Sequence, residues 1–241
     1  MTGGTAIVVG AGPGLGAALG KRFAAAGMPV ALCSRGKDNL DAVVARVSGE
    51  AGPDAGSVSA WPVDARDEAA VADLFARVEA DLGPIALAVY NAGAWFNASI
   101  LDLPAEMYEK VWRLSAFAGF LVGREAARRM APRGAGTILF SGATASLRGG
   151  SGFAAFAGGK FALRALAQSM ARELGPRGVH VAHVVIDGRI DSERTRARFG
   201  DLPDDRTLAP DDIADAYYRL HAQPRSAWTF EIDLRPWTES F

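Results

Sequence analysis

The feature that most constrains the fold is a regular alternation between short apolar runs and longer segments of helical character. The apolar runs, many rich in β-branched residues, cover 5–10, 29–34, 57–63, 85–91, 137–142, 179–186 and 227–234. Strands that are apolar throughout are buried on both faces, which is typical of a parallel sheet lying between helices. The alternation therefore predicts an α/β fold with a doubly wound, Rossmann-type parallel sheet, formed by a single domain over residues 1–241.

Helical segments occupy the intervals between these runs. They are expected at 15–26, 38–50, 67–82, 104–131, 152–174 and 210–221. One polar, arginine-rich interval, 188–208, has no clear helical or strand pattern and is expected to be a long loop. Long loops in compact domains are usually lids or binding loops, so this segment is a candidate substrate loop. A solvated surface connection is the open alternative.

Composition narrows the class of protein. The 241 residues suffice for one large domain with a full core. The formal net charge of -1 argues against nucleic acid or an anionic membrane surface as a partner. The single cysteine, Cys33, cannot form an intrachain disulfide and favours a reducing compartment. No run is long enough to span a bilayer, and the N-terminal residues lack the pattern of a signal peptide. A cytoplasmic location is expected.

A glycine-rich loop, GAGPGLG at 10–16, follows the first predicted strand and leads into a helix from Leu15. Gly10, Gly14 and Gly16 permit a tight turn and let backbone N–H groups approach a pyrophosphate at the helix N-terminus. A glycine-rich loop alone is weak evidence. At the first strand-to-helix turn of an alternating α/β chain, it predicts dinucleotide binding.

The end of the second predicted strand distinguishes the two nicotinamide cofactors. An acidic residue at this place binds the ribose 2′-hydroxyl of NAD, whereas a nearby arginine accommodates the 2′-phosphate of NADP. The sequence reads Cys33-Ser34-Arg35 and contains no acid there. Ser34 and Arg35 therefore favour NADP(H) over NAD(H).

Further motifs lie at the ends of later strands. Val63-Asp64 follows the third, Asn91-Ala92-Gly93 the fourth, and the segment 186–192, IDGRIDS, ends the sixth. With the glycine-rich loop, these motifs resemble those of the short-chain dehydrogenase/reductase family over essentially the whole chain. In the family's P-G segment a proline is usual where this chain has Asp187. The resemblance implies a strand order of 3-2-1-4-5-6-7. The cofactor-binding residues then expected are Gly10, Gly14, Leu15, Gly16, Ser34, Arg35, Asp64, Ala65, Asn91, Ala92, Gly93, Lys160, Gly188 and Ile190.

The resemblance fails at the family's catalytic residues, which are a tyrosine and lysine in Y-x-x-x-K, a serine and an asparagine. Lys160 aligns with the lysine, which places Phe156 at the tyrosine position and Ala143 at the serine position. Ser115 or Ala116 occupies the asparagine position. The resemblance implies that Lys160 binds the nicotinamide ribose.

Two functions remain open from the sequence. The first is an NADP(H)-dependent oxidoreductase that acts on a small carbonyl or alcohol compound with a non-standard proton-transfer site. A hydroxyl of Ser141 or Thr144 acting through water, Lys160 itself, or Asp187 could replace the tyrosine. Lys160, Ser115 and Ser141 are the candidate catalytic residues. A substrate that supplies its own acidic group, or a double bond reduced to a stabilised enolate, would lessen the need for a proton donor from the protein. The second function is a catalytically silent dinucleotide-binding protein, either a cofactor sensor or a partner subunit.

Other features add two expectations. The three histidines are not clustered and there is one cysteine, so no metal site is expected. The 104–131 and 152–174 segments carry alanine-rich faces. In the family that the chain resembles, the corresponding helices pack across a two-fold axis. A homodimer or homotetramer is therefore expected.

Overall fold

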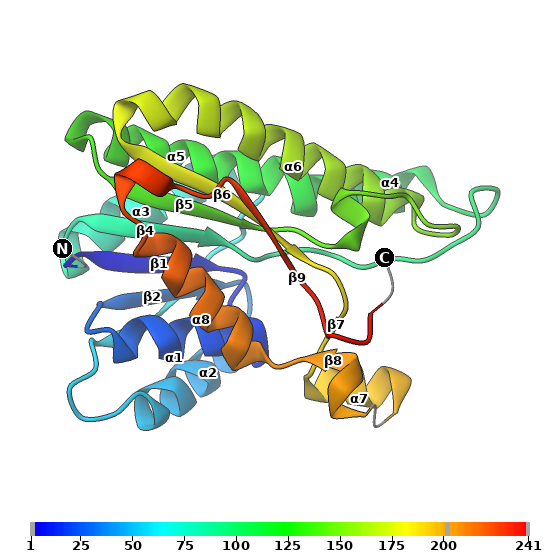
Figure 1. Cartoon of the computed structure of the whole chain (residues 1–241), viewed down its shortest axis with the longest axis horizontal. Helices are drawn as coiled ribbons and strands as arrows, with labels where there is room; N and C mark the ends of the chain where they lie inside the picture. The colour runs from blue at the N-terminus through cyan, green and yellow to red at the C-terminus, as the bar shows by residue number, and fades with distance from the viewer. Residues whose placement is uncertain (1–2, 201–202, 240–241) are drawn as a thin grey trace.

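A single parallel sheet organises the computed structural model, which describes residues 3–200 and 203–239 and gives Arg194 and Asp204 by their backbone only. The sheet has seven strands in the order β3-β2-β1-β4-β5-β6-β9 (Figure 1). The predicted order is confirmed, because the seventh predicted strand is β9. The strands are β1 (Thr5–Val9), β2 (Val30–Ser34), β3 (Val58–Pro62), β4 (Ile85–Tyr90), β5 (Gly136–Ser141), β6 (Val179–Ile186) and β9 (Glu231–Leu234).

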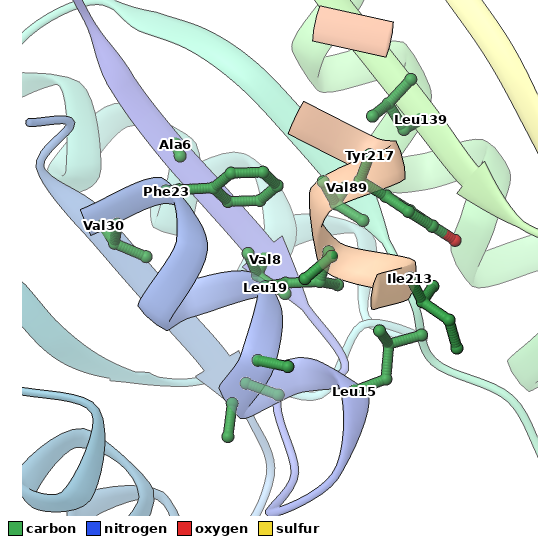
Figure 2. Packing of buried hydrophobic residues seen from close by; sticks show 14 of the residues in the cluster. Ala6, Val8, Leu15, Leu19, Phe23, Val30, Val89, Leu139, Ile213 and Tyr217 are labelled. Carbon is green, nitrogen blue, oxygen red and sulfur yellow. The ribbon is translucent and has the colours of Figure 1, made fainter. Parts of the chain in front are cut away.

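Helices cover both faces of the sheet. One layer contains α1 (Leu15–Ala25), α2 (Lys37–Glu50) and α8 (Pro210–His221), and the other contains α3 (Glu68–Leu82), α4 (Ala105–Trp112), α5 (Ala118–Arg133) and α6 (Ala154–Leu174) (Figure 1). Each layer buries its own apolar cluster against the strands. Figure 2 shows part of the first cluster, where Phe23 of α1 and Tyr217 of α8 lie against residues of the sheet. The continuous apolar strands follow from this two-sided burial.

The predicted helix 104–131 is interrupted and extends further than expected. A π-helical stretch, Arg113–Phe117, separates α4 from α5, and α5 continues through Pro132 to Arg133. The helix ends where Gly134 adopts a left-handed conformation with φ of 61°, a common helix terminator. The π turn includes Ser115, which lies against Gly159 of α6. The distortion therefore lies beside the helix that carries Lys160.

The expectation of an irregular loop at 188–208 is wrong for most of its length. The segment contains β7 (Arg189–Ile190), α7 (Glu193–Phe199) and β8 (Thr207–Leu208), and β7 and β8 pair in parallel. The side chain of Ser192 accepts a hydrogen bond from the backbone N–H of Thr195 and caps α7. The segment lies beyond the carboxyl ends of the main strands (Figure 1).

In the described part of the chain, no helix is both long and apolar enough to cross a membrane. Cys33 lies buried within β2, and this burial raises the pKa of its thiol. It is therefore a small core residue in this structure, as the sequence indicates.

Candidate functional site

The glycine-rich loop forms a narrow backbone turn between β1 and α1. A Cβ added at Gly10, where φ is 100°, would lie 2.3 Å from the backbone nitrogen of Ala92, and one added at Gly16 would lie 2.6 Å from Ala11 Cα. Gly14 caps α1 without a side-chain hydrogen bond, and Leu15 begins the helix. The first N–H groups of α1 therefore have no side-chain acceptor, and the loop fits the phosphates of a dinucleotide.

Gly10→Ala is expected to destabilise the protein by about 2–4 kcal/mol, because the methyl group meets backbone at a positive φ. Gly12→Ala, two residues along the same loop, places its Cβ with nothing within 4 Å and serves as the matched control. Its free energy of unfolding should change by less than about 1 kcal/mol. Urea denaturation of both variants measures the difference. Equal stabilities would show that the turn accommodates a side chain at position 10.

Residues that follow β2 and β3 lie beside this loop in the sheet order. Arg66 binds the Asp64 carboxylate through its Nε at 2.9 Å and its backbone nitrogen at 3.0 Å. This hydrogen bonding lowers the pKa of Asp64 to about 2, and the nearby positive charge of Arg35 contributes. Ala65 is buried, Ser34 is half-buried, and Arg35 is exposed at the end of β2. The arginine lies where the sequence analysis expects the 2′-phosphate of NADP.

A line of hydrogen bonds connects the carboxyl ends of three strands. Asn91, in the predicted Asn91-Ala92-Gly93 motif, donates its side-chain amide to Gly10 O at 3.1 Å. Ser141 donates its hydroxyl to Asn91 Oδ1 at 2.9 Å, and its Oγ lies 2.7 Å from the hydroxyl of Tyr217. Tyr217 reaches this point from α8 through the apolar cluster (Figure 2). The Ser141 hydroxyl is therefore bonded to the side chains of Asn91 and Tyr217, and its role in proton transfer stays a prediction.

Lys160 lies on α6 at the floor of the site. Its ammonium donates to Ser141 O at 2.7 Å and lies 5.9 Å from the ring centroid of Phe156. Phe156 and Lys160 therefore share one face of α6. A Cβ on Gly93 would come within 3.4 Å of Lys160 Nζ, so glycine leaves the ammonium accessible from that side. Burial lowers the pKa of Lys160 to about 8.

The positions that carry hydroxyls in Y-x-x-x-K proteins are apolar here and face open space. Phe156 and Ala143 both line a cleft at the carboxyl ends of β4, β5 and β6. Among the described residues that line this cleft, none is a tyrosine. Ser115 is fully buried, and its Oγ has no hydrogen-bond partner within the described part of the chain. Whether Ser115 takes part in chemistry stays a prediction.

Two of the alternatives that the sequence left open are bonded to each other. The Thr144 hydroxyl donates to Asp187 Oδ1, and Asp187 Oδ2 lies 3.4 Å from Arg235 Nη2. Asp187 is buried, whereas Thr144 lines the cleft. The carboxylate therefore holds the threonine hydroxyl in place, and only the hydroxyl is directly accessible from the cleft.

The cleft has a volume of about 1020 Å³. Its apolar wall includes Phe153, Phe156 and Trp95, and the Trp95 and Phe153 rings meet edge to face at 5.5 Å. Gly188 and Ile190, both predicted near the cofactor, line the opposite side. The segment between β6 and α8 therefore forms a wall of the cleft. Sequence reasoning did not single out Arg148 or Phe153 as lining residues. It gave Arg198 and Arg206 only as part of the arginine-rich candidate substrate loop at 188–208.

His183 is buried in β6 and bonded to a carboxylate of the neighbouring strand, β9. Its Nδ1 is 2.9 Å from Glu231 Oε2, and Arg164 binds the same carboxylate through Nε at 2.6 Å. Burial lowers the pKa of His183 to about 4, which keeps the ring neutral at pH 7. No set of three or more His, Cys, Asp or Glu side chains in the described residues could hold a metal ion.

Comparisons with known proteins agree with this arrangement. Residues 4–201 match the family model of the short chain dehydrogenases. The 3alpha-hydroxysteroid dehydrogenase of Mediterraneibacter gnavus is 29% identical over 235 residues, covering 94% of this chain and 93% of that protein. The crystal structure of a short-chain dehydrogenase from Rhodopseudomonas palustris is 42% identical, covers 98% of this chain and 100% of that one, and has a TM-score of 0.83. A metagenomic short-chain oxidoreductase in complex with NADP is 27% identical, covers 96% of both chains, and has a TM-score of 0.81.

Proposed function

Because the chain belongs to the short-chain dehydrogenase family, we propose that it is an NADP(H)-dependent oxidoreductase acting on a small carbonyl or alcohol compound. The observation that carries the proposal is the position of Lys160. Its ammonium lies at the junction of the Asn91 motif, the end of β5 and a cleft large enough for a substrate. When bound, the nicotinamide supplies or accepts a hydride.

The residues that would hold the cofactor form a continuous surface along the strand ends. Gly10, Gly14, Leu15 and Gly16 form the tight turn that would hold the phosphates, since side chains at Gly10 and Gly16 would collide with neighbouring backbone. Ser34 and Arg35 lie where the 2′-phosphate would bind, and Asp64 and Ala65 follow the adjacent strand. Asn91, Ala92, Gly93, Lys160, Gly188 and Ile190 continue the surface toward the cleft. The related oxidoreductase in complex with NADP supports a nicotinamide dinucleotide as cofactor, and the proposed preference for NADP(H) rests on Ser34 and Arg35.

Lys160 is also our candidate for the missing proton donor. Reducing a carbonyl produces an alkoxide that must be protonated, and Phe156 has no proton to give. With its pKa lowered to about 8, the Lys160 side chain is mostly an ammonium at pH 7 and can release a proton more readily than an exposed lysine. Ser141 and Thr144, the two hydroxyls that the sequence offers as alternatives, also line the cleft. Ser141 is bonded to Asn91 and Tyr217, and Thr144 is held by Asp187.

The absence of hydroxyls at Phe156 and Ala143 supports the second candidate function. Loss of a general acid typically lowers a rate ~10²–10⁴-fold. A protein that keeps the cofactor surface and lacks this acid could bind the dinucleotide as a sensor or as a subunit of a larger assembly. This remains the alternative to the oxidoreductase.

One experiment separates the two functions. Purified protein is titrated with NADPH by fluorescence and is then assayed for NADPH oxidation against a panel of aldehydes, ketones and keto acids. We expect micromolar binding and measurable oxidation of NADPH with at least one compound. Binding without turnover across the panel would favour the sensor, and lack of binding to either nicotinamide cofactor would exclude both functions.

Arg35→Asp is expected to shift the ratio of NADPH to NADH affinity toward NADH by about 10–100-fold, since it removes a phosphate partner and adds a ribose acceptor. Arg177→Asp, an exposed arginine before β6 at the opposite edge of the sheet, is the control for charge alone. Dissociation constants for both cofactors are measured on each variant. An unchanged ratio in Arg35→Asp would remove Arg35 from the cofactor site.

We also propose a homodimer or homotetramer that uses the outer face of α4 and α5. Trp112 and Phe120 are more than a third exposed, and Phe117 lies between them, stacked with the Trp112 ring and tilted against the Phe120 ring. A contiguous aromatic face of this kind is typical of a protein interface. Sedimentation velocity of the purified protein tests the oligomer.

With its buried, free Cys33, the chain is expected to act in the cytoplasm.

A further inference from the structure

The cleft is unusually rich in positive charge. Among the described residues that line it, five side chains are cationic, Lys160 and four arginines, and Glu239 is the one carboxylate. The whole chain carries a formal net charge of -1. The cations of this cleft are therefore a local concentration and do not reflect the composition of the chain.

The four arginines come from two opposite walls. Arg148 follows the turn after β5, whereas Arg189, Arg198 and Arg206 lie in the segment between β6 and α8. None of the four forms an ion pair with a carboxylate in the parts of the chain that the structure describes. Many arginines elsewhere do so, including Arg129 with Glu79. The charges of the cleft thus remain available to a ligand.

Aromatic rings hold two of these guanidinium groups in place. The Arg198 guanidinium carbon lies 3.7 Å from the ring centroid of Trp95, and that of Arg189 lies 4.2 Å from the ring centroid of Phe199. A stacked guanidinium keeps its positive charge and leaves its N–H edges free to donate. Stacking therefore orients these groups without neutralising them, as a binding site for a carboxylate or phosphate requires.

Resting on the proposed function, we infer that the substrate is anionic: a carbonyl or alcohol compound whose carboxylate or phosphate group is bound by the cleft arginines. The glycine-rich loop is absent from the described residues that line the cleft, so these arginines face the substrate end. The anionic group would contact Arg148 and Arg198 from the two walls, and the reacting oxygen would lie toward Lys160.

The test uses acetoacetate, its uncharged methyl ester and inorganic phosphate as probes, each titrated calorimetrically into the protein with and without NADPH. Acetoacetate is expected to bind at least tenfold more tightly than the ester, and phosphate is expected to compete with it. Arg148→Gln and Arg198→Gln should each weaken anion binding about 10–100-fold. Arg177→Gln, the same charge change at the far edge of the sheet, should leave it unchanged.

The outcomes distinguish this inference from the proposed function. Binding of acetoacetate or phosphate that depends on Arg148 and Arg198, with no NADPH oxidation by any compound of the carbonyl panel, supports an anion site in the cleft and favours the binding protein over the oxidoreductase. Oxidation of NADPH at equal rates by acetoacetate and its ester overturns the inference and leaves the oxidoreductase. A loss of NADPH affinity in Arg148→Gln and Arg198→Gln, with anion binding unchanged, would assign the arginines to the cofactor and also overturn it.

Discussion

The double substitution Phe156→Tyr with Ala143→Ser is expected to raise the rate of NADPH-dependent carbonyl reduction by ~10²–10⁴-fold. The new phenol would lie one helical turn from the Lys160 ammonium, because residues 156 and 160 share a face of α6. That charge would lower the pKa of the phenol, and the new serine would bind the substrate oxygen. Single-turnover reduction with a ketone panel measures the gain in chemistry directly.

A matched control separates a positioned acid from an added hydroxyl. Phe153→Tyr places a phenol in the same cleft, but Phe153 precedes α6 and packs against Trp95. It is expected to leave the rate within a few-fold of the wild type. If Phe156→Tyr with Ala143→Ser is no faster than Phe153→Tyr, the alignment of Phe156 with the catalytic tyrosine is wrong.

The second large effect concerns Lys160. Relative to the wild type, Lys160→Met is expected to lower the rate of carbonyl reduction ~10²–10⁴-fold. It removes the cleft-lining ammonium that can release a proton near neutral pH. Methionine fills a similar volume, and burying it avoids the desolvation of an ammonium, so the variant should fold. Lys110→Met, on the exposed surface of α4, controls for the loss of a positive charge.

The pH dependence of the wild type has a defined sign. Reduction needs the ammonium form, so its rate should be constant below pH 8 and fall about tenfold per unit above it. Oxidation of an alcohol needs the neutral amine, so its rate should rise toward pH 8 and then level off. Lys160→Arg keeps the charge but does not release a proton in this range, so it should remove both breaks. A break near pH 8 that survives in Lys160→Arg would assign proton transfer to another group.

Local sequence signals predicted the frame of the site. The apolar runs specify strands buried on both faces, and the glycine spacing places a sharp turn directly after β1. The i, i+4 spacing of Phe156 and Lys160 fixes their relative position as soon as the segment is helical. These features depend on neighbours within a few residues, so the sequence contains the information needed to predict them.

Contacts made by distant residues could not be predicted in this way. Ser141 meets Tyr217 across 76 residues, and Thr144 meets Asp187 across 43. Nothing in the local sequence indicates either pairing, although Thr144 and Asp187 were each singled out separately. Arg148 and Arg198 likewise come to one cleft through the fold. The short helix α7 was missed because seven residues are too few for an apolar periodicity to be recognised.

The bonds from Gly10 through Asn91 and Ser141 to Tyr217 have a consequence for ligand affinity. They connect the carboxyl ends of β1, β4 and β5 to Tyr217 of α8, and they are present without a bound ligand. Folding itself therefore supplies most of the ordering that a dinucleotide would otherwise have to impose. Little of the free energy of binding is then spent on ordering the site. Tight binding of the coenzyme is therefore possible even if catalysis is slow.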